Sequence, residues 1–439
     1  MDKQQILNKI KEAGVIGAGG AGFPTHIKLS CSADVVIANG AECEPLLRTD
    51  RLLMETYPEK VVAGIKAAMY VTGAKRGVIA LKKKYVKAVE AMRGALDSSM
   101  ELYLMDSFYP AGDEQQIVYE VTGKVVPTGG LPIDVGAMVQ NVATLIAIAE
   151  ALQETPVIEK YVTVAGEVSN PMVYKAPIGM PLTKLIAAAG GSKDDSEYSV
   201  IIGGPMMGRV SEDITAEVVE KTTGGIIVMP KGHTLIRQKT RDLVQDIRLA
   251  KSVCCQCNYC TQLCPRNALG LKVEPHKIMR ALALNADNFG EVNGIFSCSN
   301  CGVCTQYACN FQLAPSRLMT RVKQELAKAG VKPEKKVAFS VADNMESIKV
   351  PVSRLMIRLG IVPYDRDLQL KDETVDTDYV RLPLKMHIGA PAVPIVKTGD
   401  KAIAGQMIAS VDNGVGANLH ASITGIAMVT DKYIEIRKQ

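Results

Sequence analysis

The sequence has no long, uninterrupted hydrophobic run. The segment that comes nearest, residues 131–149, is broken by Asp134, Gly136, Gln140 and Asn141, whereas a membrane-spanning helix needs about 20 consecutive apolar residues. We therefore expect a buried helix there and no transmembrane segment. The chain also begins with acidic and amide residues where a secretory signal would be apolar. These absences predict a soluble protein, at most peripheral to a membrane, in a reducing compartment.

Concentrated positive charge is also scarce. The chain has 51 Lys and Arg against 46 Asp and Glu, a net charge of +5, and most lysines are scattered singly. The densest basic stretch, residues 82–84, is explained by one solvated face or the end of a strand. Proteins that bind nucleic acids gather such charge on one surface. We therefore expect no nucleic-acid partner.

Size and composition leave room for ordinary hydrophobic cores. A chain of 439 residues should fold as roughly two to four domains. Apolar residues make up 47% and charged residues 22%, which are ordinary globular values. The cysteines are therefore not needed to staple the fold.

What the chain does have is eight cysteines in two evenly spaced runs. The first matches the bacterial ferredoxin run, in which three close thiolates hold one iron–sulfur cluster and the fourth ligates its neighbour. Two-residue gaps let a tight loop aim three sulfurs inward, and the crossing ligand comes from the other run. The runs are Cys254-x2-Cys257-x2-Cys260-x3-Cys264-Pro265 and Cys298-x2-Cys301-x2-Cys304-x4-Cys309.

The crossed pattern predicts two [4Fe–4S] clusters and hence transfer of single electrons. One ligand set would be Cys254, Cys257, Cys260 and Cys309, and the other would be Cys298, Cys301, Cys304 and Cys264.

Three features qualify this assignment. The second run has one extra residue before Cys309, and Asn310 stands where proline is usual. Structural zinc is the alternative, because CxxC pairs also make tetrahedral sites; zinc, however, has no use for a third cysteine at the same step followed by x3-Cys-Pro. Cys255 and Cys31 fall outside the spacing and are expected to be packed or exposed thiols.

The first 155 residues alternate short β-branched runs with helical patterns. Residues 34–38 and 77–81 are expected to be buried strands, and residues 57–72 and 85–96 to be helices with apolar positions at i, i+3 and i+4. This alternation predicts an α/β domain.

The remaining chain changes texture several times. Residues 161–165 and 200–204 resemble strands and 181–189 a short helix, which suits a small α+β module. A charged stretch at 328–336 is typical of a linker, and short strands between glycine turns make the tail, from about residue 380, all-β.

A glycine-rich segment near the start is a candidate anion-binding loop. Residues 14–22 contain five glycines, and glycine lets backbone N–H groups approach a phosphate closely. A tight turn without a ligand is the alternative. An ordinary dinucleotide fingerprint is disfavoured because residues 5–13 are charged and helical in pattern, and no acidic residue closes a second strand at the proper distance.

The longer string Gly-Ala-Gly-Gly-Ala-Gly-Phe-Pro-Thr (17–25), with Lys28 following, is more specific. It resembles the flavin-binding signature of the FMN-bearing subunit of respiratory complex I and of its relatives, the RnfC subunits and PduS-type cobalamin reductases. Three further matches follow in order across the first 150 residues. They are Asn39-Gly-Ala-Glu42-Cys43-Glu44-Pro45, Tyr109-Pro-Ala-Gly112-Asp113-Glu114 and Gln140-Asn141-Val-Ala143-Thr144.

The resemblance implies a set of cofactor-binding residues. Phe23 would stack on the nicotinamide nucleotide, with Glu44 and Glu114 on the NADH side. Glu42 and Asp113 belong to the same motifs and complete the predicted site. The residues implied for FMN are Gly17, Gly19, Gly20, Lys28, Asn39, Tyr109, Gly112, Asn141 and Thr144.

Some motif positions depart from complex I and fit the RnfC/PduS branch better. Ala41 stands where complex I has an acid, and Asp113 replaces glutamate. Gln140 and Ala143 likewise replace asparagine and glutamate. These departures bear on single ligands and leave the four ordered matches intact.

The resemblance continues along the chain. Residues 158–210 resemble the family's SLBB β-grasp module, and the tail resembles its barrel-sandwich domain. No lysine lies in the turn where a lipoyl-type carrier is modified, so we expect a docking surface with structural His387 and His420. The implied modules are an FMN/NADH domain (1–155), the SLBB module and connection (156–240), a two-cluster ferredoxin-like domain (241–330), a linker (331–379) and the barrel-sandwich domain (380–439).

The function implied is oxidation of NADH by FMN, with electrons leaving singly through two [4Fe–4S] clusters. Three acceptors fit: cob(II)alamin, a partner reductase subunit, or an Rnf-type membrane complex, and the module order favours the first two. The alternative is an electron-transfer scaffold that does not oxidise NADH, which Ala41 and Ala143 leave open. No side chain is expected to act as a general acid or base. The resemblance implies a cytoplasmic protein in a hetero-oligomer, peripheral to a membrane complex or within a microcompartment.

Overall fold

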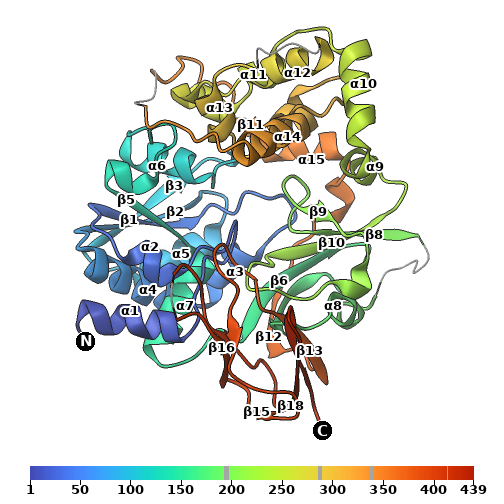
Figure 1. Cartoon of the computed structure of the whole chain (residues 1–439). Coiled ribbons are helices and arrows are strands. Elements are labelled where there is room, and N and C mark those ends of the chain that lie inside the picture. The colour runs from blue at the N-terminus through green and yellow to red at the C-terminus, as the bar shows by residue number, and fades with distance from the viewer. Residues whose placement is uncertain (192–196, 285–288, 337–339, 413) are drawn as a thin grey trace.

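The structure is a computed structural model that describes residues 1–191, 197–284, 289–336, 340–412 and 414–439. The chain folds into four modules that pack against one another (Figure 1). The N-terminal module (residues 1–157) lies beside the second module (158–240). The cysteine module (243–328) caps both from above, and the tail module (379–437) lies below them.

The N-terminal module is built on a parallel four-stranded sheet in the order β3-β2-β1-β5. β1 and β2 are buried on both faces, as parallel sheets covered by helices are. The strands are β1 (Val35–Gly40), β2 (Arg76–Lys82), β3 (Met100–Met105), β4 (Phe108–Tyr109) and β5 (Ala137–Asn141). The helices are α1 (Lys3–Glu12), α2 (Thr25–Leu29), α3 (Thr49–Thr56), α4 (Pro58–Thr72), α5 (Val86–Ala95), α6 (Glu114–Thr122), the short η1 (Pro132–Val135) and α7 (Val142–Leu152).

The expected strands and helices of this module are confirmed, with one correction. Residues 131–149 do not form one buried helix. They form η1, β5 and the start of α7 in succession. Gly136, at a φ of 81°, ends η1, and the Asn141 side chain caps α7 by accepting from the Ala143 N–H. Two of the residues that break the apolar run, Gly136 and Asn141, thus mark the boundaries between these elements.

The second module has a six-stranded sheet in the order β12-β7-β6-β10-β8-β9. Its apolar core is contributed mainly by β6, β7, β10 and α8, so the expected α+β module is confirmed. Its elements are β6 (Glu159–Gly166), β7 (Met172–Pro177), α8 (Leu182–Ala188), β8 (Tyr198–Ile202), β9 (Arg209–Val210), η2 (Ile214–Ala216), β10 (Gly225–Pro230) and α9 (Thr234–Thr240).

The segment expected to be a linker, 331–379, contains regular elements that pack on other modules. β11 (Val350–Pro351) pairs with β4 of the N-terminal module. β12 (Leu370–Thr374) pairs with β7 at the edge of the six-stranded sheet. Between them lie α15 (Val352–Leu359) and η5 (Val362–Tyr364). The segment therefore ties modules together.

The cysteine module is helical and the tail is all-β. The helices of the cysteine module are α10 (Leu243–Val253), α11 (Tyr259–Gln262), η3 (Asn267–Leu271), α12 (Pro275–Leu284), α13 (Val292–Ser297), η4 (Cys304–Ala308) and α14 (Pro315–Lys328). The tail strands form two small sheets, β13-β19-β18-β15 and β14-β16-β17. They are β13 (Tyr379–Pro383), β14 (Val393–Pro394), β15 (Lys401–Ala402), β16 (Met407–Ser410), β17 (Leu419–His420), β18 (Gly425–Val429) and β19 (Tyr433–Arg437).

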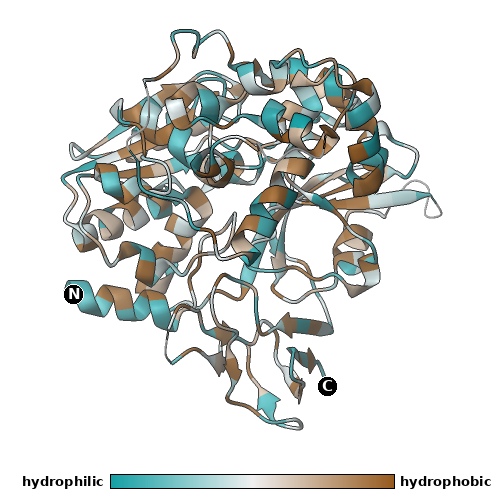
Figure 2. Ribbon diagram, turned by 45° about the horizontal axis from the view of Figure 1, so that its top comes forward, coloured by the Kyte–Doolittle hydropathy of each residue, from teal (hydrophilic) through white to brown (hydrophobic). Residues whose placement is uncertain are grey.

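One apolar cluster, which we call the shared core, joins three modules and α15. Figure 2 shows that helices around the main sheets carry hydrophobic residues on one side and hydrophilic residues on the other. Burying such stripes between modules fixes the modules relative to one another. The shared core includes Leu46, Tyr109, Ile201, Met206, Cys301, Val303, Leu355 and Leu359.

Candidate functional site: a cavity under the glycine loop and two cysteine-lined cavities

The glycine-rich segment forms a loop held at several points. The Gly17 N–H donates to the Phe23 carbonyl at 2.9 Å and closes the loop. The Ala18 N–H donates to Thr144 Oγ1 at 2.9 Å, and Lys160 Nζ donates to the Ala18 carbonyl at 2.8 Å. A Cβ atom at Gly19 would meet nothing within 4 Å. The crest of the loop therefore borders open space.

That open space is a cavity of about 620 Å³ between the N-terminal and second modules. All four motifs singled out in the sequence contribute to its lining. The predicted site residues that line it are Gly19, Gly20, Asn39, Glu42, Glu44, Gly112 and Asn141. Its opposite wall comes from the second module and includes Gly203, Gly204, Gly208, Thr222, Thr223 and Gly224.

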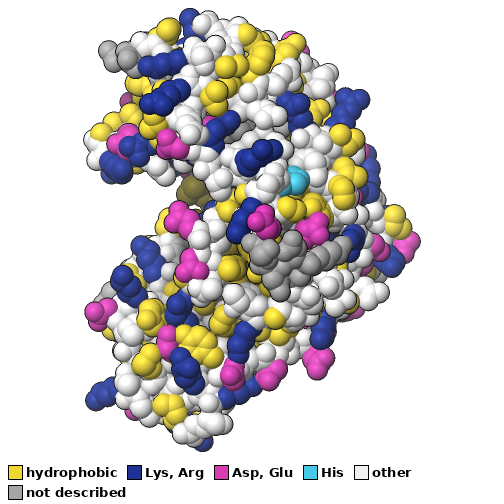
Figure 3. Space-filling view, turned by 90° about the vertical axis from the view of Figure 1, so that its right-hand side faces the viewer, with side chains coloured by type: hydrophobic (Ala, Val, Ile, Leu, Met, Phe, Trp, Pro, Cys, Tyr) yellow, Lys and Arg dark blue, Asp and Glu magenta, His cyan; other side chains and the backbone are white. Residues whose placement is uncertain are grey.

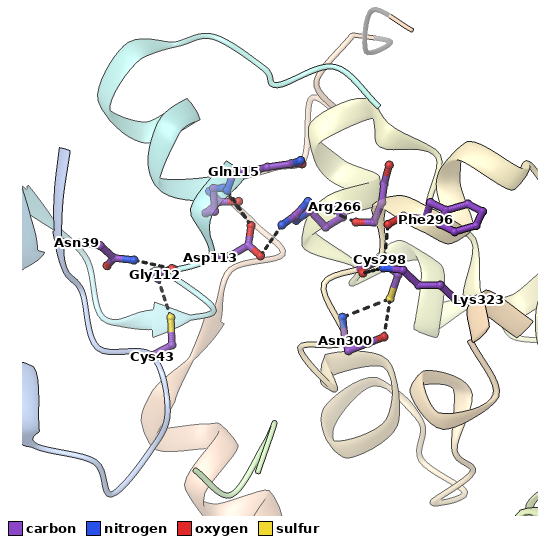
Figure 4. Close-up of polar contacts among 12 residues, drawn as sticks. Asn39, Cys43, Gly112, Asp113, Gln115, Arg266, Phe296, Cys298, Asn300 and Lys323 are labelled. Atoms are coloured by element: carbon purple, nitrogen blue, oxygen red, sulfur yellow. Dashed lines mark hydrogen bonds and ion pairs between the residues drawn. The ribbon is translucent and has the colours of Figure 1, made fainter. Parts of the chain in front are cut away.

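A tight turn places Asn39 and Gly112 side by side. Asn39 Nδ2 donates to the Gly112 carbonyl at 2.8 Å, and the Gly112 N–H donates to Cys43 Sγ at 2.7 Å (Figure 4). Burial raises the pKa of Cys43 to about 12, so this sulfur is a protonated thiol in a packing role. A Cβ at Gly112 would lie 2.9 Å from the Ala41 carbonyl oxygen and 2.9 Å from Cys43 Sγ. Only glycine fits this position.

Acidic and basic groups share the cavity floor. Asn141 Nδ2 donates to Asp50 Oδ2 at 2.8 Å. Burial, then repulsion by Asp50, raises the pKa of Glu42 to about 7, and burial raises that of Asp50 to about 6. Glu42 Oε2 is buried without a hydrogen-bond partner. Burial also lowers the pKa of Lys160 to about 8. Sequence reasoning missed Asp50 and Lys160, because each approaches the cavity from an element outside the motifs.

Glu44, expected on the NADH side, is held by the second module. Its carboxylate accepts from the Met206 N–H and the Met207 N–H, both at 2.8 Å. Lys239 Nζ binds the opposite side of that loop, donating to the carbonyls of Met206 at 3.0 Å and Gly208 at 2.6 Å. The loop that closes one end of the cavity is thereby fixed from two modules.

The other predicted residues lie around the cavity and not on its lining. Tyr109 is 1% exposed, and its hydroxyl donates to the Cys301 carbonyl at 2.6 Å. Lys28 Nζ forms an ion pair with Glu114 at 2.9 Å. Phe23 is 38% exposed. The predicted residues outside the lining are Gly17, Phe23, Lys28, Tyr109, Asp113, Glu114 and Thr144.

The eight cysteines surround two further cavities, and the structure brings them together in the crossed pattern. We call these the outer cavity and the inner cavity, because Cys257 is exposed whereas Cys264, Cys301 and Cys304 are buried. The outer cavity is lined by Cys254, Cys257, Cys260 and Cys309. The inner cavity is lined by Cys264, Cys298, Cys301 and Cys304.

The two cysteine loops use the same backbone geometry. In each loop, the second and fourth residues after the first cysteine have a left-handed backbone conformation. After Cys254 these are Gln256 (φ 58°) and Asn258 (φ 64°). After Cys298 they are Asn300 (φ 56°) and Gly302 (φ 79°). Non-glycine residues rarely adopt this conformation, and it marks sites where the surroundings impose it. Here it turns three consecutive sulfurs to one side.

The extra residue of the second run is taken up by a wider helical turn. Residues Cys304–Ala308 form a π-helical turn, which accommodates one residue more than an α-turn and often occurs at functional sites. Cys309 consequently reaches the outer cavity without the usual proline. Arg358 Nη2, on α15, donates to the Cys309 carbonyl at 3.0 Å. The element missed by sequence reasoning thus supports the least regular cysteine.

His276 lines the outer cavity, and its Nδ1 is 2.7 Å from Thr261 Oγ1. Cys255 is exposed at the same cavity. Among the residues that the structure describes, no three His, Cys, Asp or Glu side chains converge on a single metal-ion position. The sulfurs instead line two separate cavities, four in each crossed set.

The histidines of the tail are buried, as expected for structural residues. His387 Nε2 accepts from the Ala417 N–H at 2.8 Å. Burial lowers the pKa of His420 to about 4, which keeps its ring neutral. Within the described ranges, no helix combines the length and apolar character needed to cross a membrane.

Comparison with known families assigns each module. The family models that match are the Nuo51 FMN-binding domain over residues 10–150, the SLBB domain over 161–210, the 4Fe-4S dicluster domain over 253–314 and the RnfC barrel sandwich hybrid domain over 360–437. These matches define an electron-transfer protein with an FMN-binding domain and an iron–sulfur dicluster domain, and they confirm the module types expected from the sequence.

Two curated relatives place this electron-transfer protein in one family. Cobalamin reductase PduS of Citrobacter freundii is 39% identical over 99% of this chain and 97% of its own length. PduS of Salmonella typhimurium is 39% identical over 97% of this chain and 94% of its own length. The chain therefore belongs to the PduS cobalamin reductase family, within the wider RnfC group of oxidoreductases.

Two more distant matches complete the comparison. A subunit of the Na⁺-translocating ferredoxin:NAD⁺ oxidoreductase complex of Acetobacterium woodii is 38% identical over 60% of this chain and 58% of its own length. Among solved structures, NAD⁺-reducing [NiFe]-hydrogenase in the H2-reduced state is 22% identical, with a TM-score of 0.49, and the match covers 76% of this chain and 63% of that one.

Proposed function

We propose that the protein oxidises NADH with FMN and passes the electrons singly, through two [4Fe–4S] clusters, to cob(II)alamin or a partner reductase. The observation that carries the proposal is convergence: four separated motifs line one cavity, and eight cysteines line two others in the crossed pattern. The shared core packs Tyr109 of the N-terminal module against Cys301 of the inner cavity.

The cavity under the glycine loop suits FMN. Gly19 and Gly20 leave the loop backbone open to a ligand, since a Cβ at either would meet nothing within 4 Å. Asn39 and Asn141 present amides from neighbouring strand ends. The buried Lys160 ammonium lines the same cavity and offers a cation for a phosphate. Gly17, Lys28, Tyr109 and Thr144 complete the proposed FMN set, with Thr144 acting by holding Ala18.

The nicotinamide side is proposed to involve Phe23, Glu44 and Glu114, with Glu42 and Asp113 nearby. Phe23 offers a partly exposed ring. Glu44 lines the cavity and accepts from the Met206 N–H, whereas Glu114 pairs with Lys28 outside the lining. FMN would accept a hydride from NADH and release single electrons, which is chemistry the cofactor itself supplies. These residues supply binding, orientation and exclusion of water.

The proposed cluster ligands are the two crossed sets of cysteines. Each cavity is lined by three sulfurs from one loop and a fourth from the other run, the pattern in which two-cluster proteins hold cubane clusters. The ligands of the outer cluster are Cys254, Cys257, Cys260 and Cys309, and those of the inner cluster are Cys264, Cys298, Cys301 and Cys304.

The acceptor is proposed from the relatives that match nearly the whole chain, which are named cobalamin reductases. A partner reductase is the second candidate, because the relative in Acetobacterium woodii belongs to a multisubunit complex. We propose a cytoplasmic protein that works within a hetero-oligomer, at a membrane complex or in a microcompartment. We propose no nucleic-acid partner.

The experiment is anaerobic purification followed by addition of NADH. The proposal predicts that NADH bleaches the flavin absorbance and that the protein then reduces a viologen dye and cob(II)alamin. Bound FMN that does not respond to NADH would overturn NADH oxidation and leave an electron-transfer scaffold fed by another flavoprotein. Reduction of viologen without reduction of cob(II)alamin would point to a partner reductase instead.

A further inference from the structure

Arg266 lies between the flavin-motif turn and the inner cavity. It follows Cys264 by two residues and lines the inner cavity. Its side chain is only 11% exposed, and its Nη2 forms an ion pair with Asp113 Oδ2 at 2.8 Å. Its Nη1 donates to the Ser297 carbonyl at 3.3 Å, next to Cys298 (Figure 4). One guanidinium that lines the inner cavity therefore joins the residue before the second cysteine run to the N-terminal module.

Asp113 connects this guanidinium to the cavity under the glycine loop. It directly follows Gly112, whose backbone binds Asn39 and Cys43. Asp113 Oδ1 caps α6 by accepting from the backbone N–H groups of Gln115 and Gln116. Its two oxygens thus divide their roles, one capping the helix and one pairing with Arg266. Asp113 is 8% exposed, so water screens this ion pair little.

Arg266 also has a donor that no protein atom satisfies. Its Nε is buried without a hydrogen-bond partner, and a buried unpaired donor is costly. The neighbouring cavity would hold an anionic thiolate-ligated cluster. A buried cation beside such a cluster stabilises the state with one more electron, and charge and hydrogen bonds to sulfur are the means by which proteins set cluster potentials.

We propose that Arg266 positions the loop of Cys298, Cys301 and Cys304, called here the inner cysteine loop, against the Gly112–Asp113 turn. We further propose that it raises the reduction potential of the inner cluster. This inference rests on the proposed function, because it requires the crossed cysteine sets to hold two clusters. Asp113 partly offsets the positive charge of Arg266, so the two residues set the potential in opposite directions. Lys323, whose Nζ donates to the carbonyls of Phe296 and Cys298, adds a second, separate cation near this loop.

The test is an anaerobic redox titration of the complete protein, followed by EPR, with the inner-cluster signal assigned as the one lost in Cys264→Ser. Arg266→Gln should shift the midpoint potential of the inner cluster downward and leave the outer cluster unchanged. Asp113→Asn should shift the inner cluster upward, because asparagine still caps α6 but no longer offsets the guanidinium. Arg266→Lys keeps the positive charge, so its inner-cluster potential should lie close to that of the unaltered protein.

A matched control lies just before the cysteine module. Arg241 Nε pairs with the buried Asp246 at 2.6 Å, and neither residue lines a cysteine cavity. Arg241→Gln should leave both potentials unchanged. If Arg266→Gln does not fold, the double variant Asp113→Asn with Arg266→Gln leaves no orphaned charge, and it should titrate below Asp113→Asn alone.

The inference is overturned if Arg266→Gln leaves the inner potential unchanged, if the double variant titrates no lower than Asp113→Asn alone, or if both clusters shift equally. Failure of the proposed function is seen differently, as the lack of two cluster signals in the unaltered protein.

Discussion

Single residues decide which sulfurs share a cavity. Cys264 is sequential with the outer run but lies in the inner cavity with Cys298, Cys301 and Cys304. We predict that Cys264→Ser removes the inner cluster and about half of the iron while leaving the outer cluster in place, as the crossed ligation pattern requires. Iron analysis and EPR of the reduced protein measure this. Loss of the outer cluster instead would contradict the crossed pattern.

Cys255 provides the matched control for that substitution. It is exposed and adjacent to Cys254, and using it as a ligand would break the spacing of the run. Cys255→Ser should therefore retain both clusters and full iron content.

Gly112 is the residue at which the cavity tolerates no side chain. A Cβ there would lie 2.9 Å from both the Ala41 carbonyl and Cys43 Sγ, so the turn that presents Asn39 must move. We predict that Gly112→Ala lowers the FMN content per chain severalfold, measured by flavin fluorescence after denaturation. Gly94→Ala on α5 is the control, because a Cβ there meets nothing within 4 Å; it should retain FMN. Equal FMN content in the two variants would contradict the prediction.

Glu42 makes the stability of the protein depend on pH. Burial raises its folded-state pKa from 4.5 to about 7, so between these values the folded state binds more protons than the unfolded state. Stability then falls as pH rises through this window. We predict that Glu42→Gln removes this loss, so that its melting temperature rises relative to the unaltered protein from about pH 5 to about pH 7. Calorimetry from about pH 5 to about pH 7 measures the melting temperatures of Glu42→Gln and of the unaltered protein. A difference between them that does not change with pH would contradict the raised pKa of Glu42.

At the scale of elements, α15 holds the modules together. Leu355 is 0% exposed and belongs to the shared core, whereas Ile357, two residues on, is 69% exposed. We predict that Leu355→Ala lowers the free energy of unfolding by about 2–5 kcal/mol, because the cavity it leaves lies where several modules meet. Ile357→Ala should change it by less than about 0.5 kcal/mol. Denaturant unfolding of the two variants provides the comparison, and equal losses would show that the shared core is not continuous through α15.

Elements defined by local periodicity could be predicted from the sequence. The expected strands at 34–38 and 77–81 became β1 and β2, since continuous apolar runs indicate strands covered on both faces. Residues 331–379 could not be predicted in this way. β11 and β12 acquire their structure by pairing with β4 and β7, far away in the chain, and such pairing leaves no periodic signal in the segment itself.

The same limit applies to the candidate site. Cysteine spacing predicted which sulfurs share a cavity, because the spacing reflects local loop geometry. The engagement of Glu44 by Met206 and Met207, and of Asp113 by Arg266, could not be predicted. Each pairs residues that lie far apart in the chain, and a surface carboxylate and a buried one look alike in a sequence.

For the whole molecule, the arrangement of modules brings the cavity under the glycine loop close to the inner cavity. The cavity under the glycine loop lies between two modules, and Tyr109 and Asp113 reach from its edge to the inner cysteine loop. Seen from the side of α8 and α9, the molecule is hollowed between its upper and lower parts (Figure 3). The outer cavity is lined by exposed Cys257, whereas Cys264, Cys301 and Cys304 of the inner cavity are buried.

The most direct test of the whole account is to add NADH to the anaerobic protein and compare its EPR spectrum with that of the dithionite-reduced protein. NADH oxidation through FMN predicts bleaching of the flavin and iron–sulfur signals from both cavities, abolished together when FMN is removed. Dithionite-reducible clusters and bound FMN that remain fully oxidised in NADH would contradict it.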